Sequence, residues 1–276
     1  MFVSAAVENS VFQILRQAFA HQPRIAQLPR LGHPPSAEEF LTLCLRGYPF
    51  IYPLDLPHTS WESICKTLGQ ESLEVESRQS RFRSPGEYDT GRILEKHSLK
   101  EFLAHLDGDS PYAGVQLLPK KLAHALGAHP PEFVSLPFAS PSFWIGPRGA
   151  RTPLHKDGSD NFAMHIWGSK RWFLFPLADA SVLDYRPRTG QPEHIEYAIS
   201  HATAVFPSSP EFELQTGRQP LVVDVRAGEA LYVPAGWGHA VENLSLSLMI
   251  NHWHDRDAFA ASVRSRFGVV AFTPTR

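Results

Sequence analysis

Hydrophobic and polar positions divide the chain into a helical first part and a strand-rich second part. Hydrophobic residues recur at helical spacing over residues 7–20 and predict a helix there. A proline-punctuated stretch, residues 23–35, then interrupts regular structure. Ser36 is followed by two glutamates, a pattern typical of a helix N-cap, and predicts a helix that ends near residue 45. Further helices are expected over residues 61–68 and 98–106, and strands over 48–52 and 73–82.

From Ser142 onward, short hydrophobic or alternating segments follow one another and are separated by turn residues. They predict strands over residues 143–146, 161–167, 171–175, 221–225, 231–233 and 246–253. This arrangement is typical of an antiparallel β sandwich or barrel. Residues 176–219 show little periodicity and several prolines, so we expect a long loop of the kind that is often functional. A last helix is expected over residues 255–267.

These elements suggest a division of the 276 residues into two parts. Residues 1–35 form an N-terminal helix and its connector. Residues 36–276 form one mainly β domain with flanking helices, in which a barrel core occupies about 112–253 and a helix closes the chain.

Composition narrows the class of protein. The chain is 43% hydrophobic and 20% charged, as expected of a soluble globular protein. A net charge of −2 and a pI near 6.7 provide no field for nucleic acid or an anionic membrane. The two cysteines, Cys44 and Cys65, lie in predicted helices and do not indicate a disulfide framework. Residues 1–20 resemble no signal peptide, and no apolar run approaches the roughly 18 residues that cross a bilayer. We therefore expect a cytoplasmic protein.

The first chemical motif is His155-Lys-Asp157. Non-haem iron oxygenases bind Fe(II) with two histidines and one carboxylate and leave the remaining positions open. Because side chains alternate along a strand, residues two apart can chelate one ion. The spacing alone is weak evidence, since His105-Leu-Asp107 repeats it at a predicted helix end, where an inert role is favoured.

The second motif lies about 70 residues further on. Residues 228–243 match the pattern Gly-x5-Pro-x-Gly-x2-His-x3-Asn at all five fixed positions, which are Gly228, Pro234, Gly236, His239 and Asn243. The glycines and the proline favour a bend that directs His239 inward. His239 is thus the candidate third ligand beside His155 and Asp157.

With these two motifs the chain resembles the JmjC-type, cupin-like Fe(II)- and 2-oxoglutarate-dependent oxygenases, including the asparaginyl hydroxylase of hypoxia-inducible factor. The resemblance covers residues 112–253 and implies a double-stranded β-helix, or jelly-roll, barrel. It implies that His155, Asp157 and His239 bind Fe(II), and that 2-oxoglutarate and O2 are co-substrates. The co-substrate residues that it implies are Lys170, Thr152, Tyr112, Asn161 and Asn251. Trp253 matches a family aromatic residue behind that site and is interpreted as packing.

Lys170 is also a candidate anion-binding residue without the resemblance. A strand lysine beside aromatic neighbours is costly to bury unless an anion binds it. The alternatives are a solvated lysine at this position, a core role for Tyr112, and strand-end hydrogen bonding for Thr152 and Asn251.

Other polar residues near the motifs have two interpretations. His165 shares the strand face of Asn161, and a satisfied core histidine is favoured over a substrate contact. Trp237 is either a pocket or a core residue, and Lys156 is expected to point away from the ligands. Arg148 and Arg151 either attract an acidic substrate or form a solvated edge. His252 and His254 are rejected as ligands, because a fourth protein ligand would close a position that the reaction needs.

Several functions remain open at this point. Hydroxylation of an amino-acid side chain, in a protein, a peptide, or a free or carrier-bound amino acid, is the preferred hypothesis from the resemblance. N-methyl demethylation or oxidation of a nucleoside is the alternative, and a non-enzymatic metal-binding cupin scaffold is the rival from another class. The resemblance also implies dimerisation through a C-terminal helical region. Only about one predicted helix follows Trp253, so the N-terminal helix is the candidate for a homodimer.

Overall fold

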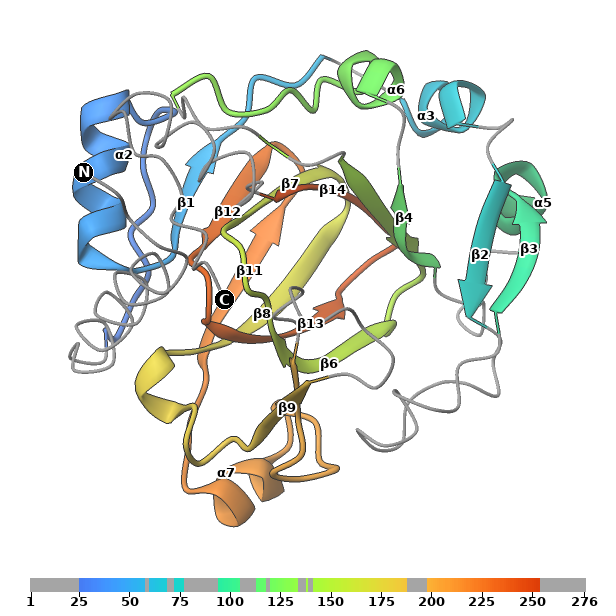
Figure 1. Cartoon of the computed structure of the whole chain (residues 1–276). Coiled ribbons are helices and arrows are strands. Elements are labelled where there is room, and N and C mark those ends of the chain that lie inside the picture. The colour runs from blue at the N-terminus through green and yellow to red at the C-terminus, as the bar shows by residue number, and fades with distance from the viewer. Residues whose placement is uncertain are drawn as a thin grey trace, which may run out of the picture.

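Two antiparallel sheets packed face to face form the centre of the molecule, with short helices around them (Figure 1). The structure, a computed structural model, describes residues 25–57, 60–68, 72–76, 94–104, 113–117, 120–133, 138, 141–187 and 198–253. The helices expected over residues 7–20 and 255–267 lie outside this part, as do His105, Asp107, Tyr112 and His254. None of the helices within the described residues is long and apolar enough to cross a membrane.

The sheets have six strands each. The first has the order β1-β12-β7-β14-β5-β4 and consists of Phe50–Pro53, Glu229–Val233, Asn161–Trp167, Ser247–Trp253, Ser142–Gly146 and Ala113–Leu117. The second has the order β11-β8-β13-β6-β10-β9 and consists of Leu221–Arg226, Ser169–Phe175, Gly238–Asn243, Arg151–Lys156, Ala198–Ser200 and Tyr185–Pro187. A separate hairpin pairs β2 (Ser72–Glu76) with β3 (Leu94–Ser98).

The strand order is that of a jelly roll. Successive strands from β5 to β8, and again from β11 to β14, alternate between the two sheets. The resulting orders, β12-β7-β14-β5 in one sheet and β11-β8-β13-β6 in the other, are those of a double-stranded β-helix. The predicted fold class is therefore confirmed.

Helices lie outside the barrel. They are α2 (Ala37–Arg46), α3 (Trp61–Leu68), α5 (Leu99–Ala104), α6 (Lys120–Ala125), the 3-10 helix η2 (Leu177–Asp179) and α7 (Pro210–Thr216). Reciprocal capping begins two of them. Ser36 exchanges hydrogen bonds with Glu39 before α2, and Ser98 does so with Glu101 before α5. The predicted helix starts are thus confirmed.

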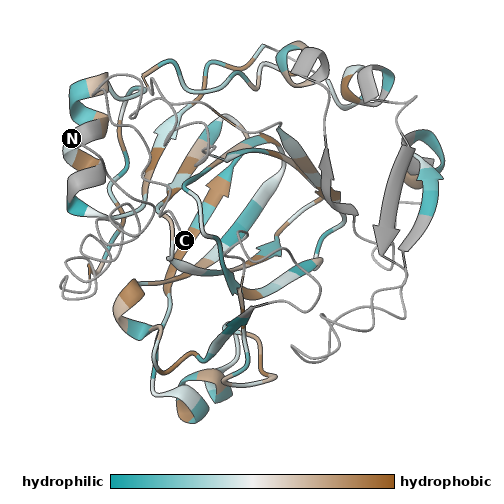
Figure 2. Cartoon of the chain, viewed as in Figure 1, coloured by the Kyte–Doolittle hydropathy of each residue, from teal (hydrophilic) through white to brown (hydrophobic). Residues whose placement is uncertain are grey.

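Three hydrophobic clusters organise these layers. One lies between the first sheet and α2, α3 and α5, and contains Phe40, Ile64 and Phe102. The second contains residues of both sheets, among them Trp144, Trp172 and Val241, and therefore fills the barrel interior. The third packs α7 on the outer face of the second sheet. In Figure 2, hydrophilic segments interrupt the hydrophobic barrel strands, and several polar residues of these strands are buried.

The region expected to be a long loop contains regular structure. Residues 176–219 include η2, β9, β10 and α7, so the prediction of a single irregular loop is wrong. Ser209 caps α7, Pro210 begins it and Gly217 ends it with a φ of 62°. That N-terminal proline and C-terminal glycine are the sequence signals that could have revealed the helix.

Candidate metal and co-substrate site

The two candidate histidines face each other across neighbouring strands. His155 on β6 is directly opposite His239 on β13, and their ring centroids lie 4.1 Å apart. Both are buried, with exposed fractions of 4% and 2%. Hydrogen-bond register between two strands therefore brings together residues that are 84 positions apart in sequence.

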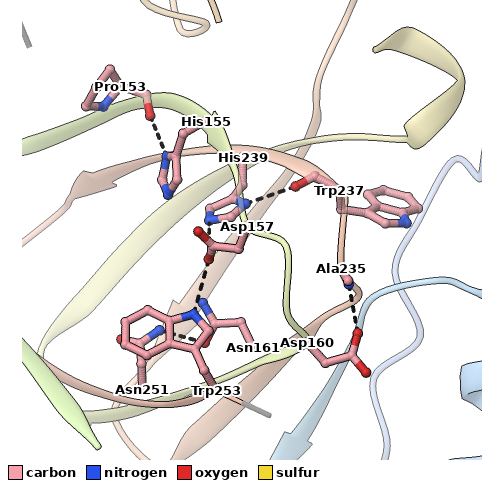
Figure 3. Close-up of polar contacts among 10 residues, drawn as sticks. All are labelled: Pro153, His155, Asp157, Asp160, Asn161, Ala235, Trp237, His239, Asn251 and Trp253. Atoms are coloured by element: carbon pink, nitrogen blue, oxygen red, sulfur yellow. Dashed lines mark hydrogen bonds and ion pairs between the residues drawn. The ribbon is translucent and has the colours of Figure 1, made fainter. Parts of the chain in front are cut away.

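Asp157 completes a group of three. Its Oδ2 lies 3.7 Å from Nε2 of His239, and one ligand atom from each of the three residues lies within 4.8 Å of the others (Figure 3). β6 ends at Lys156, so Asp157 follows the strand and the expectation that both first ligands lie on one strand is wrong in this detail. Two imidazoles and one carboxylate are the donor set of non-haem Fe(II) sites, so these residues fit iron.

Backbone carbonyls define which nitrogen of each histidine can bind a metal. Nδ1 of His155 lies 2.8 Å from the carbonyl oxygen of Pro153, and Nδ1 of His239 lies 3.1 Å from that of Trp237. Because a carbonyl only accepts, each Nδ1 carries the proton and each Nε2 keeps its lone pair. Burial, reinforced by His239, lowers the pKa of His155 to about 4, which keeps the ring neutral near pH 7.

A bulge in β6 between Thr152 and His155 brings Thr152 to the same face as His155. His155 is opposite His239 and Thr152 is opposite Val241, so three steps on β6 match two on β13. Val241 belongs to the interior cluster, whereas Leu154 packs in the outer one. Buried Thr152 therefore faces the interior although it lies three residues from His155, which strict alternation would forbid.

Two asparagines and a tryptophan lie beside the candidate metal ligands. Asn251 donates a hydrogen bond of 2.7 Å to Oδ1 of Asn161, and both are buried. The indole nitrogen of Trp253 donates to Oδ2 of Asp157 at 3.2 Å. The sequence pattern predicts only a packing role for Trp253, because this contact depends on the meeting of β14 with the segment after β6.

Lys170 lies at the other end of the barrel interior. Its side chain is fully buried and donates a hydrogen bond of 2.7 Å to Oδ1 of Asn243, a neutral amide. Asn243 is itself held by donating to the carbonyls of Gly146 and Pro147. Burial lowers the pKa of Lys170 to about 7. The alternative of a solvated lysine is therefore wrong, and a bound carboxylate would offset the cost of this buried charge.

The first sheet also presents buried polar atoms to the interior. Ser142 is opposite Asn251 on β14 and Ser247 is opposite Gly146 on β5, so both share the face of the interior residues. Among the residues that the structure describes, neither hydroxyl has a hydrogen-bond partner, and the same holds for Oδ1 of Asn251. Unsatisfied polar atoms inside a barrel indicate a site for a polar ligand.

The remaining candidate residues point to different faces of the two sheets. Buried His165 accepts a hydrogen bond from Nε1 of Trp172 at 3.2 Å, and burial and Lys170 lower its pKa to about 3. Trp237 is also buried, and its indole donates to the carbonyl of Gly47. Lys156 points to the outer face, where its amine lies 5.4 Å from the Tyr185 ring.

Three further candidates lie away from the site. Arg151 forms an ion pair with Glu242 on the outer face of the second sheet, and Arg148 is exposed. His252 is buried against Phe138 and the carbonyl of Ala128, on the face of β14 opposite to Asn251. His252 is therefore directed away from Asp157 and His239, as the rejection of it as a ligand requires.

Comparison with known proteins agrees with this arrangement. A family model for a cupin-like domain matches residues 66–259, more than half of the chain. The chain belongs to the cupin-like domain family. It is 32% identical to HSPB1-associated protein 1 homolog of Danio rerio over 118 residues, which are 42% of this chain and 26% of the relative.

Two other relatives of this cupin-like chain have names that state an activity. The human 2-oxoglutarate and iron-dependent oxygenase JMJD4 is 33% identical over 112 residues, which are 40% of this chain and 25% of that protein. The human bifunctional peptidase and (3S)-lysyl hydroxylase JMJD7 is 27% identical over 208 residues, 65% of this chain and 64% of that protein. The chain thus spans about a quarter of the length of the first relatives and under two thirds of JMJD7.

Proposed function

We propose that this protein is an Fe(II)- and 2-oxoglutarate-dependent oxygenase that hydroxylates an amino-acid side chain. The observation that supports the proposal is that a set of candidate metal ligands and a buried lysine occur in one barrel interior. His155, Asp157 and His239 converge as a set of iron ligands, and the fully buried amine of Lys170 lies further inside. A metal-binding scaffold has no need of the second feature.

Each end of the interior has its own task in this proposal. The three ligands hold Fe(II), while Lys170 pairs with the distal carboxylate of 2-oxoglutarate and Thr152 donates a hydrogen bond to it. Asn161 and Asn251 border the opposite end of the co-substrate, and Tyr112 is the further residue that the family resemblance implies. Asn243 is added to this set, because it is the hydrogen-bond acceptor for Lys170.

The overall reaction consumes one C–H bond, O2 and 2-oxoglutarate and yields C–OH, succinate and CO2. The bound iron supplies the oxidising chemistry. The protein itself orients the co-substrate between the two histidines and the buried amine of Lys170, and its hydrophobic interior excludes water. No protein side chain is required as a general base.

A side chain of a protein or peptide is the preferred substrate, with a free or carrier-bound amino acid as the narrower variant. Support comes from the relative whose name is (3S)-lysyl hydroxylase. The division at residue 35, the cytoplasmic location and the homodimer expected from the sequence stay predictions.

Succinate formation tests the proposal. The full chain, with Fe(II), ascorbate and 2-oxoglutarate, is expected to release succinate, and addition of cell extract, peptides or free amino acids should reveal an iron-dependent product heavier by 16 Da. Absence of both turnover and 2-oxoglutarate binding would favour the scaffold. Loss of a methyl group from the product would favour demethylation.

A further inference from the structure

The carboxylate of Asp157 lies just beyond the end of β6, so contacts from other segments must orient it. Because β6 ends at Lys156, the strand ladder does not hold Asp157. Its carbonyl accepts a hydrogen bond of 2.8 Å from the N–H of Gly236, and Asp160 accepts one from the N–H of Ala235. These contacts hold the main chain after β6 but leave the carboxylate free to rotate.

Trp253 provides the missing contact. It is the last residue of β14 in the first sheet, where it pairs with Asn161, whereas Asp157 follows a strand of the second sheet. Its indole N–H lies 3.2 Å from Oδ2 of Asp157, so the hydrogen bond joins the two sheets at the metal end of the barrel (Figure 3). An indole N–H can only donate, and an ionised carboxylate can only accept, so the direction of this bond is unambiguous.

We propose that Trp253 is a positioning residue that orients the Asp157 carboxylate toward the two histidine nitrogens, an inference that rests on the metal site of the proposed function. A carboxylate has about four lone-pair directions, and the indole N–H occupies one of them on Oδ2. It thereby limits rotation of the carboxylate, so that the same lone pairs face His155 and His239 in the metal-free protein. Hydrogen bonds of this kind to metal ligands typically change metal affinity by about 10- to 100-fold.

The competing explanation is packing, because Trp253 also lies against the interior hydrophobic cluster. The substitution Trp253→Phe separates the two, since phenylalanine keeps an aromatic ring and removes only the N–H donor and part of the volume. Trp167→Phe is a matched control. Trp167 is also half-buried and at the end of a strand of the same sheet, but it packs on Trp61 outside the barrel, with ring centroids 5.6 Å apart.

The test measures Co(II) binding by the full chain, because Co(II) reports its ligands in its visible absorption. Trp253→Phe is expected to weaken Co(II) binding about 10- to 100-fold and to alter the absorption spectrum. The melting temperature of its metal-free form should match that of Trp167→Phe, which should keep wild-type affinity and spectrum. Trp253→Gln, whose side-chain amide can restore an N–H donor, should recover part of the affinity.

Three outcomes would overturn the proposal, and they are distinguishable. Unchanged Co(II) affinity and spectrum in Trp253→Phe would leave Trp253 as packing and keep the metal site. A loss of affinity that follows a lowered melting temperature, with no spectral change, would assign the loss to packing as well. Failure of the wild-type chain to bind Co(II) more tightly than His239→Ala would remove the metal site itself.

Discussion

The two ends of the barrel interior differ in the kind of ionisable side chain that they present. At the candidate metal end, His155, Asp157 and His239 present two imidazoles and a carboxylate, and the Asp157 side chain remains 15% exposed. At the other end, Lys170 presents a basic amine with no exposed surface, which donates a hydrogen bond to the neutral amide of Asn243. β13 connects the ends, because it carries both His239 and Asn243. Along β13, four residues at about 3.4 Å each separate the backbone of His239 from that of Asn243 by roughly 14 Å.

One strand, β13, therefore contributes a residue to each of the two candidate binding sites. The two candidate histidine ligands are held by backbone groups, since the carbonyls of Pro153 and Trp237 orient them. The amine is held by a side chain, Asn243, that backbone carbonyls orient in turn. The two ends should therefore respond independently to substitution, and four predictions test that independence.

The largest effect is expected at the metal end. His239→Ala leaves two ligands and should abolish iron-dependent succinate formation and metal binding. The exposed His33→Ala is the control and should keep both. Turnover at the wild-type rate in His239→Ala would contradict the assignment of the ligands.

At the amine end, Lys170→Met should weaken 2-oxoglutarate binding by roughly 1.5–3 kcal/mol, the range for hydrogen bonds to charged groups. Affinity for Co(II) should be unchanged, as calorimetry on the metal-loaded and metal-free protein can show. Lys96→Met removes the same charge from an exposed position on β3 and serves as control. Equal loss of metal binding in Lys170→Met would refute the independence of the two ends.

Solution pH should also distinguish the ends. Burial lowers the pKa of Lys170 to about 7, so above that pH the amine must take up a proton when a carboxylate binds. Affinity for 2-oxoglutarate should therefore fall as pH rises from 7 to 9, by up to about tenfold per unit, or about 1.4 kcal/mol. Lys170→Met should lose this slope. A wild-type affinity that is constant over this interval would contradict a neutralised amine.

The smallest effect is expected for Thr152→Val, which keeps the shape of the side chain and removes its hydroxyl. Because Lys170 still pairs with the carboxylate, 2-oxoglutarate binding should weaken by about 1 kcal/mol. Thr42→Val, on the exposed face of α2, is the control. If both variants bind 2-oxoglutarate equally well, Thr152 has no contact with the co-substrate.

Much of the fold was predictable where local pattern and tertiary packing agree. The helix Trp61–Leu68 and the strand Asn161–Trp167 have the predicted bounds. The predictions failed where short elements depend on distant partners. β10 has three residues and exists because β6 and β9 pair with it. Such a strand leaves little periodicity in the sequence.

The same distinction between local pattern and tertiary packing applies to the residues of the candidate site. The motifs pointed to His155, Asp157 and His239, and the family resemblance added Lys170, because metal and carboxylate binding require particular residue types. Asn243 was recognised only as a motif position, and its contact with Lys170 depends on the pairing of β13 with β8. The Trp253 contact likewise depends on β14 reaching the segment that follows β6.

By itself, the sequence determined which chemistry this chain can support: two imidazoles, a carboxylate and a lysine at fixed spacings within a strand-rich region. The tertiary structure alone decided which of these side chains share one interior. A bulge between Thr152 and His155 turned Thr152 inward, and sheet register joined His155 to His239. The physical reason is that side-chain direction on a strand follows from pairing with neighbours, so one extra residue in a ladder reverses the face of everything beyond it.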